Sequence, residues 1–157
     1  MSVKSVDKDI TKLHPDFLPL WEKVQDSIIM YNLPLIVFEA YRSPERQTYL
    51  FDEGRSKLKG RQGAHTYGMA VDVILDTDGF TDLSGYSPWE TGVKNGQIGF
   101  PDVLAVWLYL GRVLHDEHPM LRWGGDWRKG KKVALGWDPY HIELDGWANH
   151  ALGKIEH

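Results

Sequence analysis

The sequence predicts a single α+β domain, and three observations support this fold class. Segments with helical spacing of apolar residues are mixed with short runs of β-branched and aromatic residues, without the regular strand and helix alternation of an α/β protein. A chain of 157 residues is long enough to bury one hydrophobic core without disulfides. The composition, 42% hydrophobic and 25% charged, is typical of globular proteins. We therefore expect residues 1–157 to form one domain.

The first half of the chain carries signals for two helices and a strand. Apolar residues at near-helical spacing predict an amphipathic helix over residues 17–31. The apolar run 35–38 has β-branched and aromatic members, so it predicts a short buried strand. Ser43 followed by Pro44 is typical of a helix N-cap and first helical position, and indicates a helix that continues to about Asp52.

The second half carries two more strands and the strongest helix. Residues 69–75 alternate as a strand, with Asp72 on the face opposite Val71 and Val73. The stretch 84–99, rich in glycine, aromatic and polar residues, predicts a long loop that could form a wall of a cleft. A broad apolar stripe predicts a helix over residues 101–115. Residues 140–144 alternate as a last strand.

Composition and charge exclude several classes of protein. The chain has no cysteine, which excludes disulfides, zinc fingers and thiol nucleophiles. A net charge of −4 gives no reason to expect nucleic-acid binding. The first residues lack the apolar core of a signal peptide, and no later run is long enough to span a membrane. We therefore expect synthesis in the cytoplasm, without membrane insertion.

Three residues could together bind a metal ion. His65 precedes a glycine turn, Asp72 lies in the strand that follows, and His141 lies close to the end of the chain. Two histidines and one carboxylate form a ligand set of catalytic zinc sites, which leave one position to water. Asp138, three residues before His141, could act as the general base without binding the metal.

Two other segments have weaker signals for a metal ion. The acidic turn Asp76–Asp82 resembles part of a calcium loop, but it lacks the full ligand spacing, and an ordinary Asp-Gly turn is favoured. His115 and His118 could mimic a metal pair, but no third ligand accompanies them, and a role at the end of the helix is favoured.

Two loops concentrate basic residues, at Arg55–Arg61 and at Arg128–Lys132. Charge runs of this kind are usually solvated loops. Because both loops flank segments with candidate site residues, they are also reasonable places to contact an anionic polymer.

Five features in a fixed order resemble one family over residues 35–143. They are Tyr41-Arg42-Ser43, Gln47, the pattern His-x-x-Gly-x-Ala-x-Asp over residues 65–72, the block Trp123-Gly124-Gly125-Asp126-Trp127, and Asp-x-x-His over residues 138–141. Together they resemble the M15 zinc peptidases, and within them the L-alanyl-D-glutamate endopeptidases, which include bacteriophage endolysins. The ordered set is far more specific than any single motif.

The resemblance implies a fold and a site. His65, Asp72 and His141 match the positions of the family's ligands to one catalytic zinc ion, Asp138 matches its acid/base, and Arg42 matches the arginine near the substrate carbonyl or carboxylate. The implied fold is a small α+β domain with a central antiparallel sheet flanked by helices. It is shared with D-alanyl-D-alanine carboxypeptidases and the hedgehog signalling domain, and the implied substrate is the peptidoglycan stem peptide.

The motifs leave some alternatives open. The family usually has a serine at the position of Gly63, so a substrate contact there is in question. Carboxypeptidases of the family resemble Glu-x-x-His, so Asp138 favours an endopeptidase over a D-alanyl-D-alanine carboxypeptidase. A non-catalytic zinc-containing wall-binding module is a third alternative. Either Glu143 or Asp126 could hydrogen-bond a ligand histidine.

The expected biology is that of a phage endolysin with antimicrobial activity. Such a protein is a monomer that reaches the cell wall after a separate holin-type protein has permeabilised the membrane. A bacterial or prophage enzyme is the alternative.

Overall fold

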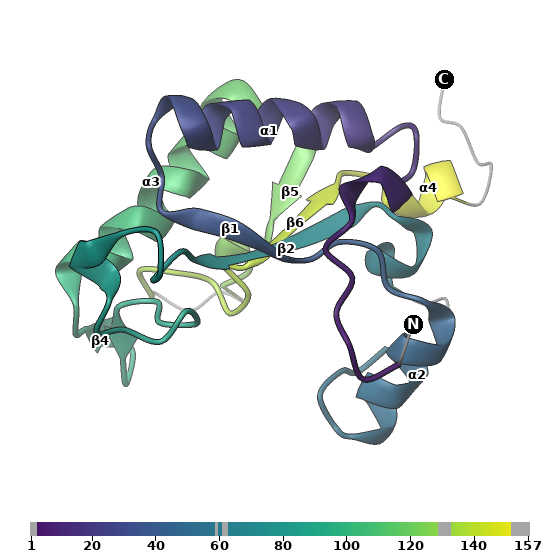
Figure 1. The fold of residues 1–157 in the computed structure, drawn as a ribbon, viewed down its shortest axis with the longest axis horizontal. Coiled ribbons are helices and arrows are strands. Elements are labelled where there is room, and N and C mark those ends of the chain that lie inside the picture. Colours follow the sequence, from purple (N-terminus) through teal and green to yellow (C-terminus); the bar gives the residue numbers. More distant parts are fainter. Residues whose placement is uncertain (1–2, 59, 61–62, 129–132, 152–157) are drawn as a thin grey trace.

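The computed structural model describes residues 3–58, 60, 63–128 and 133–151 (Figure 1). Its helices are α1 (Leu18–Met30), α2 (Pro44–Asp52), α3 (Pro101–Glu117) and α4 (Trp147–Ala151). Its strands are β1 (Leu35–Glu39), β2 (Ala70–Leu75), β3 (Val93–Lys94), β4 (Gln97–Ile98), β5 (Leu121–Trp123) and β6 (His141–Leu144). No helix in these ranges is both long and apolar enough to cross a membrane.

Four strands form one antiparallel sheet in the order β1-β2-β6-β5. β2 and β6 lie in the middle, and their register places Asp72 directly beside His141. The α+β class with a central antiparallel sheet is thereby confirmed. β5 was not predicted, because a strand of three residues has too short a pattern to be recognised before its partner is known.

Helices α1 and α3 pack on one face of the sheet and leave the other face to the site. In Figure 1, α1 lies above the sheet with α3 behind it, and α2 lies below. Trp21 of α1 and Trp107 of α3 are fully buried in one core with Val71 and Val73 of β2. Because side chains alternate along a strand, Asp72 points away from this core.

The predicted helices are confirmed with small changes at their ends. The Ser43 side chain accepts a hydrogen bond from the Arg46 backbone N–H at 3.0 Å, so α2 begins at Pro44 as the cap signal indicates. The helix predicted over residues 17–31 is α1. The helix predicted over residues 101–115 extends to Glu117 in α3.

The prediction of a buried strand at residues 35–38 was wrong in part. β1 is an edge strand, and Ile36 is 41% exposed. A bulge between Val37 and Glu39 shifts the pairing with β2, so that Glu39 lies opposite Asp72. The bulge therefore brings an acidic residue to the end of the strand, where its side chain is buried.

The stretch 84–99 is more ordered than the predicted loop, because the short hairpin β3–β4 lies within it. Nearby, in the acidic turn 76–82, a side-chain oxygen of Asp76 accepts the backbone N–H of Gly79 at 2.8 Å. This is the local bond expected of an Asp-Gly turn.

Candidate functional site

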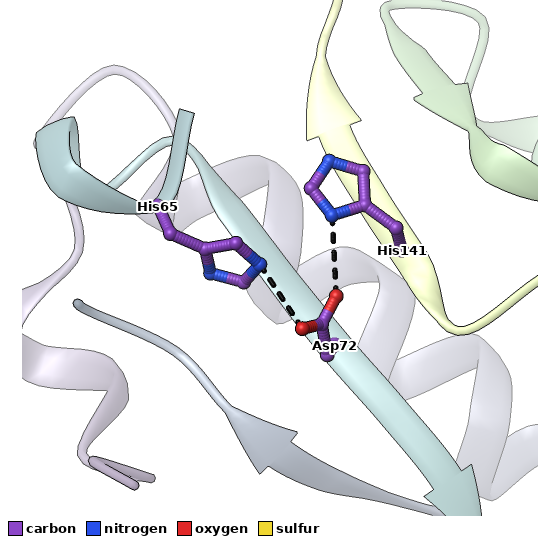
Figure 2. A group of neighbouring side chains, drawn as sticks. All are labelled: His65, Asp72 and His141. Carbon is purple, nitrogen blue, oxygen red and sulfur yellow. Dashed lines mark hydrogen bonds and ion pairs between the residues drawn. The ribbon is translucent and has the colours of Figure 1, made fainter. Parts of the chain in front are cut away.

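His65, Asp72 and His141 meet on the open face of the sheet. His65 lies in the 3₁₀ turn Ala64–Tyr67, Asp72 on β2 and His141 at the start of β6. His65 Nε2 lies 3.2 Å from Asp72 Oδ2, and His141 Nδ1 lies 3.1 Å from Asp72 Oδ1 (Figure 2). One ligand atom from each residue lies within 4.8 Å of the others, a spacing suited to one ion.

A glycine at the end of the 3₁₀ turn allows His65 and Asp72 to face each other. Gly68 has a φ of +69°, and a Cβ there would lie 2.7 Å from the His14 backbone nitrogen. Both the left-handed conformation and the close approach require glycine. The chain can therefore reverse direction between the turn and β2.

Hydrogen bonds decide which nitrogen of each histidine is available to a metal. His65 Nδ1 donates to the Ala40 carbonyl at 2.8 Å, while His65 Nε2 is buried and, although 3.2 Å from Asp72 Oδ2, makes no well-aligned hydrogen bond to any described residue. His141 Nε2 donates to Glu143 Oε1 at 2.7 Å. Each ring thus turns its other nitrogen toward Asp72. The orphaned nitrogen and the nitrogen and oxygen donor set fit one zinc ion.

The charges of the cluster are strongly coupled. Burial alone would lower the pKa of His141, but hydrogen bonds to Asp72 and Glu143 outweigh it and raise this pKa to about 10. Burial would raise the pKa of Asp72, but both neighbouring histidines hold it well below its usual range. The carboxylate is therefore charged, and a metal cation binding to His141 must displace a proton.

Arg42 is held beside the cluster by a buried ion-pair network. Its Nη2 lies 2.8 Å from Glu39 Oε1 and 3.6 Å from Asp72 Oδ2, and its Nη1 donates to Gln47 at 2.9 Å. Arg46 donates to the other oxygen of Glu39. The sequence analysis assigned no role in the site to Glu39 or Arg46, although Glu39 directly follows the apolar run predicted as a strand.

Asp138 lies in the same cleft and is half-buried. Burial raises the pKa of its carboxyl group, and the negative charge of Asp72 contributes in the same direction. Within the described part of the chain, no hydrogen bond holds its carboxylate, unlike that of Glu39. An unbonded carboxylate of raised pKa beside a candidate metal centre can exchange protons with a substrate or water.

The glycines of the Trp-Gly-Gly block shape the backbone around Asp138. A Cβ on Gly124 would lie 1.9 Å from the Asp138 carbonyl oxygen, and one on Gly125 would lie 2.1 Å from the ring of Trp123. The Asp138 N–H donates to the Gly124 carbonyl at 3.3 Å. The block therefore supports the segment that carries Asp138.

Two tryptophans that the sequence analysis did not assign to the site lie along this cleft. The Trp127 ring lies 5.3 Å from the His141 ring and 5.2 Å from the Trp137 ring, measured between centroids. The Arg122 guanidinium lies 5.7 Å from the Trp127 centroid. Their presence in the Trp-rich block and next to Asp138 was a signal, but it did not indicate which rings reach the cleft.

The cleft has a volume of about 890 Å³ and includes all five residues expected at the site. Arg55 and Lys57 also line it. Gly63 lies at its wall, where a Cβ would lie 3.6 Å from the Gln47 side-chain oxygen. Of the two basic loops, residues 59, 61–62 and 129–132 lie outside the described residues.

Of the two acids expected beside a ligand histidine, only Glu143 is there. Asp126 instead accepts a hydrogen bond from His115 Nε2 at 2.7 Å. His115 lies in the last turn of α3, and His118 caps that helix and contacts Ser27. In the described ranges, the only group suited to a metal ion is His65, Asp72 and His141.

No family model matches the chain. The chain is 26% identical over 139 residues to the peptidoglycan L-alanyl-D-glutamate endopeptidase CwlK of Bacillus subtilis strain 168. This alignment covers 84% of the chain and 73% of that protein.

Solved structures resemble the fold. The L-Ala D-Glu endopeptidase ChiX of Serratia marcescens has a TM-score of 0.51 at 22% identity, covering 91% of this chain and 88% of ChiX. The D,D-dipeptidase VanXYg has a TM-score of 0.51 at 15% identity, covering 92% of this chain and 57% of that one. VanYB, solved with D-alanine-D-alanine, has a TM-score of 0.50 at 14% identity, and the match covers 91% of this chain and 78% of VanYB.

These structural likenesses concern the fold, and the sequence relative adds an alignment over most of the chain. The His-Asp-His cluster is compatible with one zinc ion. The alignment with CwlK and the arrangement of the cleft support the interpretation of this chain as an M15-like peptidase, and the solved structures show the fold.

Proposed function

We propose that the protein is a zinc-dependent hydrolase of the L-alanyl-D-glutamate bond in peptidoglycan stem peptides. The observation that carries the proposal is the half-buried carboxylate of Asp138, which no described residue hydrogen-bonds, in the same cleft as the His-Asp-His cluster. The names of the sequence relative CwlK and of ChiX, both endopeptidases of this bond, support the choice of substrate.

His65 Nε2, Asp72 and His141 Nδ1 would hold the zinc ion. When bound, such an ion supplies a Lewis acid that polarises a carbonyl and lowers the pKa of water to about 7. Asp138 takes a proton from the attacking water and passes it to the leaving amine. Arg42, fixed by Glu39 and Gln47, hydrogen-bonds the substrate carbonyl or carboxylate oxygen and stabilises negative charge on it.

Two other functions fit parts of the site. A D-alanyl-D-alanine carboxypeptidase would share the fold with VanYB, but an aspartate at position 138 resembles the endopeptidases. A wall-binding module would keep the metal ligands but would have little structural reason to keep Asp138, whose side chain no described residue uses. We therefore favour the endopeptidase.

The biological role that we propose is phage endolysin activity, which lyses the host after a separate holin-type protein has opened the membrane. We propose that the protein acts as a monomer, because all five site residues come from one chain.

The test is digestion of purified peptidoglycan by the zinc-loaded wild-type protein, with the new termini identified by mass spectrometry. We expect new N-terminal D-glutamate. Asp138→Ala should lower kcat/KM by about 10²- to 10⁴-fold, the usual contribution of general acid–base catalysis, with zinc still bound. Asp126→Ala is the matched control, because Asp126 pairs with His115 outside the metal cluster.

Other results would point elsewhere. Release of terminal D-alanine would assign the protein to the carboxypeptidases. No cleavage by a folded, zinc-bound protein would contradict the enzyme and favour a binding module.

A further inference from the structure

A row of aromatic rings leads from the candidate metal centre to solvent. Trp127 lies against His141, and Trp137 lies against Trp127, with about the same ring spacing at each step. Trp137 is 61% exposed and lines the cleft. A single exposed tryptophan is not unusual, but two indole rings in contact at the wall of a cleft form a contiguous apolar surface, which is typical of a ligand-binding groove.

The backbone holds this pair of rings in place before any ligand binds. The Trp137 N–H donates to the Trp127 carbonyl at 3.2 Å, and the adjacent Gly136 N–H donates to the Gly125 carbonyl at 2.6 Å. A Cβ on Gly136 would lie 2.6 Å from that same carbonyl oxygen, so the two segments are in tight contact. A rigid aromatic surface loses little conformational entropy on binding.

The opposite side of the cleft is basic. Arg42 lies just before α2, and Arg55 and Lys57 follow that helix. In the part of the chain that the structure describes, no carboxylate pairs with Arg55 or Lys57. In Figure 1, α2 and the segment after it lie at the lower right and the segment leading into β6 lies at the lower left, both below the sheet. Arg122 lies at the aromatic end and contacts Trp127, but it pairs with Glu143 at 3.9 Å. The basic side chains that no described carboxylate pairs, Arg55 and Lys57, therefore lie at the other end of the cleft.

The proposed substrate is asymmetric in the same way. On the C-terminal side of the scissile bond lies D-glutamate with its free carboxylate, which suits the basic end. On the N-terminal side, a single L-alanine separates the bond from the lactyl group and the sugar ring of N-acetylmuramic acid. The polarity of the cleft therefore places this sugar at the aromatic end.

We propose that Trp137 and Trp127 form a subsite for the N-acetylmuramic acid ring, an inference that depends on the proposed function. One residue spans at most about 3.6 Å, so an alanine and a lactyl group of similar length place the sugar roughly 7–10 Å from the scissile bond. Two ring-to-ring steps, of 5.3 Å from His141 to Trp127 and 5.2 Å from Trp127 to Trp137, separate Trp137 from the metal ligand. Trp137 is therefore about as far from the metal centre as the sugar is from the scissile bond. The indole faces pack against the C–H face of the sugar, whose polar groups stay in water.

The test compares two substrates that differ only in the sugar. One is an N-acetylmuramoyl stem peptide, and the other is the same peptide with only the lactyl group, without the sugar, on L-alanine. We expect the wild-type kcat/KM to favour the muramoyl peptide by about threefold to tenfold, the usual range for one aromatic stacking contact. Trp137→Ala should bring this ratio close to one, and Trp137→Tyr should restore most of it.

Tyr109→Ala is the control, because Tyr109 is an exposed aromatic residue of α3 outside the cleft. It should leave the ratio unchanged. The proposal is overturned if the wild-type protein does not prefer the muramoyl peptide, or if Trp137→Ala lowers kcat/KM equally for both substrates.

A binding measurement separates this inference from the proposed function. N-acetylmuramoyl dipeptide is titrated into the zinc-bound Asp138→Asn protein, and the indole N–H resonances are followed by NMR. We expect a shift of the resonance that Trp137→Tyr removes, and weaker binding in the Trp137→Ala background. Cleavage of neither substrate would contradict the endopeptidase, whereas binding that Trp137→Ala does not weaken would overturn the sugar subsite.

Discussion

Each histidine of the candidate metal centre has one ring nitrogen occupied by a hydrogen bond and the other directed at Asp72. The Ala40 carbonyl occupies His65 Nδ1, and Glu143 occupies His141 Nε2. Glu143 is buried, and β6 carries it on the same face as His141. Partners of this kind fix the tautomer and orientation of a metal-binding histidine and increase its basicity. The zinc affinity should therefore depend on Glu143.

We expect Glu143→Gln to weaken zinc binding by about 10- to 100-fold, as is usual when the carboxylate partner of a ligand histidine is lost. The measurement is competition with a chromophoric chelator at neutral pH. Asp126→Asn is the matched control, because Asp126 bonds to His115 instead of to the cluster. Equal zinc affinity of Glu143→Gln and the wild-type protein would contradict the role of Glu143.

At the scale of secondary-structure elements, two segments separated in the sequence are in close backbone contact next to Asp138. The turn after β5 holds Gly124 and Gly125, and the segment before β6 holds Gly136 and Asp138. Their backbones approach so closely that no side chain fits between them at Gly124. Such contact transmits the position of the β5–β6 pair directly to Asp138.

We therefore expect Gly124→Ala to lower the free energy of unfolding by about 1–3 kcal/mol, the usual cost of overpacking, and to reduce the rate of cleavage by displacing Asp138. Urea denaturation and kcat/KM are the measurements. Gly85→Ala is the control, because a Cβ at Gly85 meets no atom within 4 Å. A Gly124→Ala protein with wild-type stability and rate would show that the contact is unimportant.

For the molecule as a whole, the packing of α1 against α3 includes polar contacts near the ends of both helices. The Tyr31 hydroxyl donates to Glu117 at 2.6 Å, on the surface. Ser27 Oγ lies 2.9 Å from His118 Nε2, where a neutral ring can accept a hydrogen bond from the hydroxyl group. Burial lowers the pKa of His118 from its usual 6.5, and Lys23 adds to this, while Glu117 opposes it. The folded protein therefore binds a proton at His118 less readily than the unfolded chain.

The sign of the resulting pH dependence is set by this lowered pKa. At pH 7.5 the ring is neutral in both states, and as the pH falls through about 6.5 the unfolded chain takes up a proton first. Stability should therefore fall between pH 7.5 and pH 5.5. We expect a smaller fall in His118→Gln, measured as the change in urea midpoint. Equal changes in both proteins would exclude His118 as the cause.

Local signals predicted α1, α2, α3 and much of the site, but not the short helix α4. The Ser43-Pro44 cap predicted the start of α2, and the alternation around Asp72 predicted a face away from the core. These signals succeed because capping and alternation depend on neighbours in the chain. β5 and the bulge before Glu39 were missed, because each exists only through pairing with a distant strand.

The sequence by itself determined the residue types of the site: two histidines, an aspartate between them, a second aspartate and an arginine, in an order that resembles one family. Only the tertiary structure decided that Glu143 and not Asp126 contacts a histidine of the cluster, that Glu39 fixes Arg42, and that Trp127 and Trp137 line the cleft. The reason is physical. The amino-acid sequence gives the type of each metal-ligating or hydrogen-bonding side chain. The partner of each side chain is set by strand pairing and by close backbone contacts between distant segments.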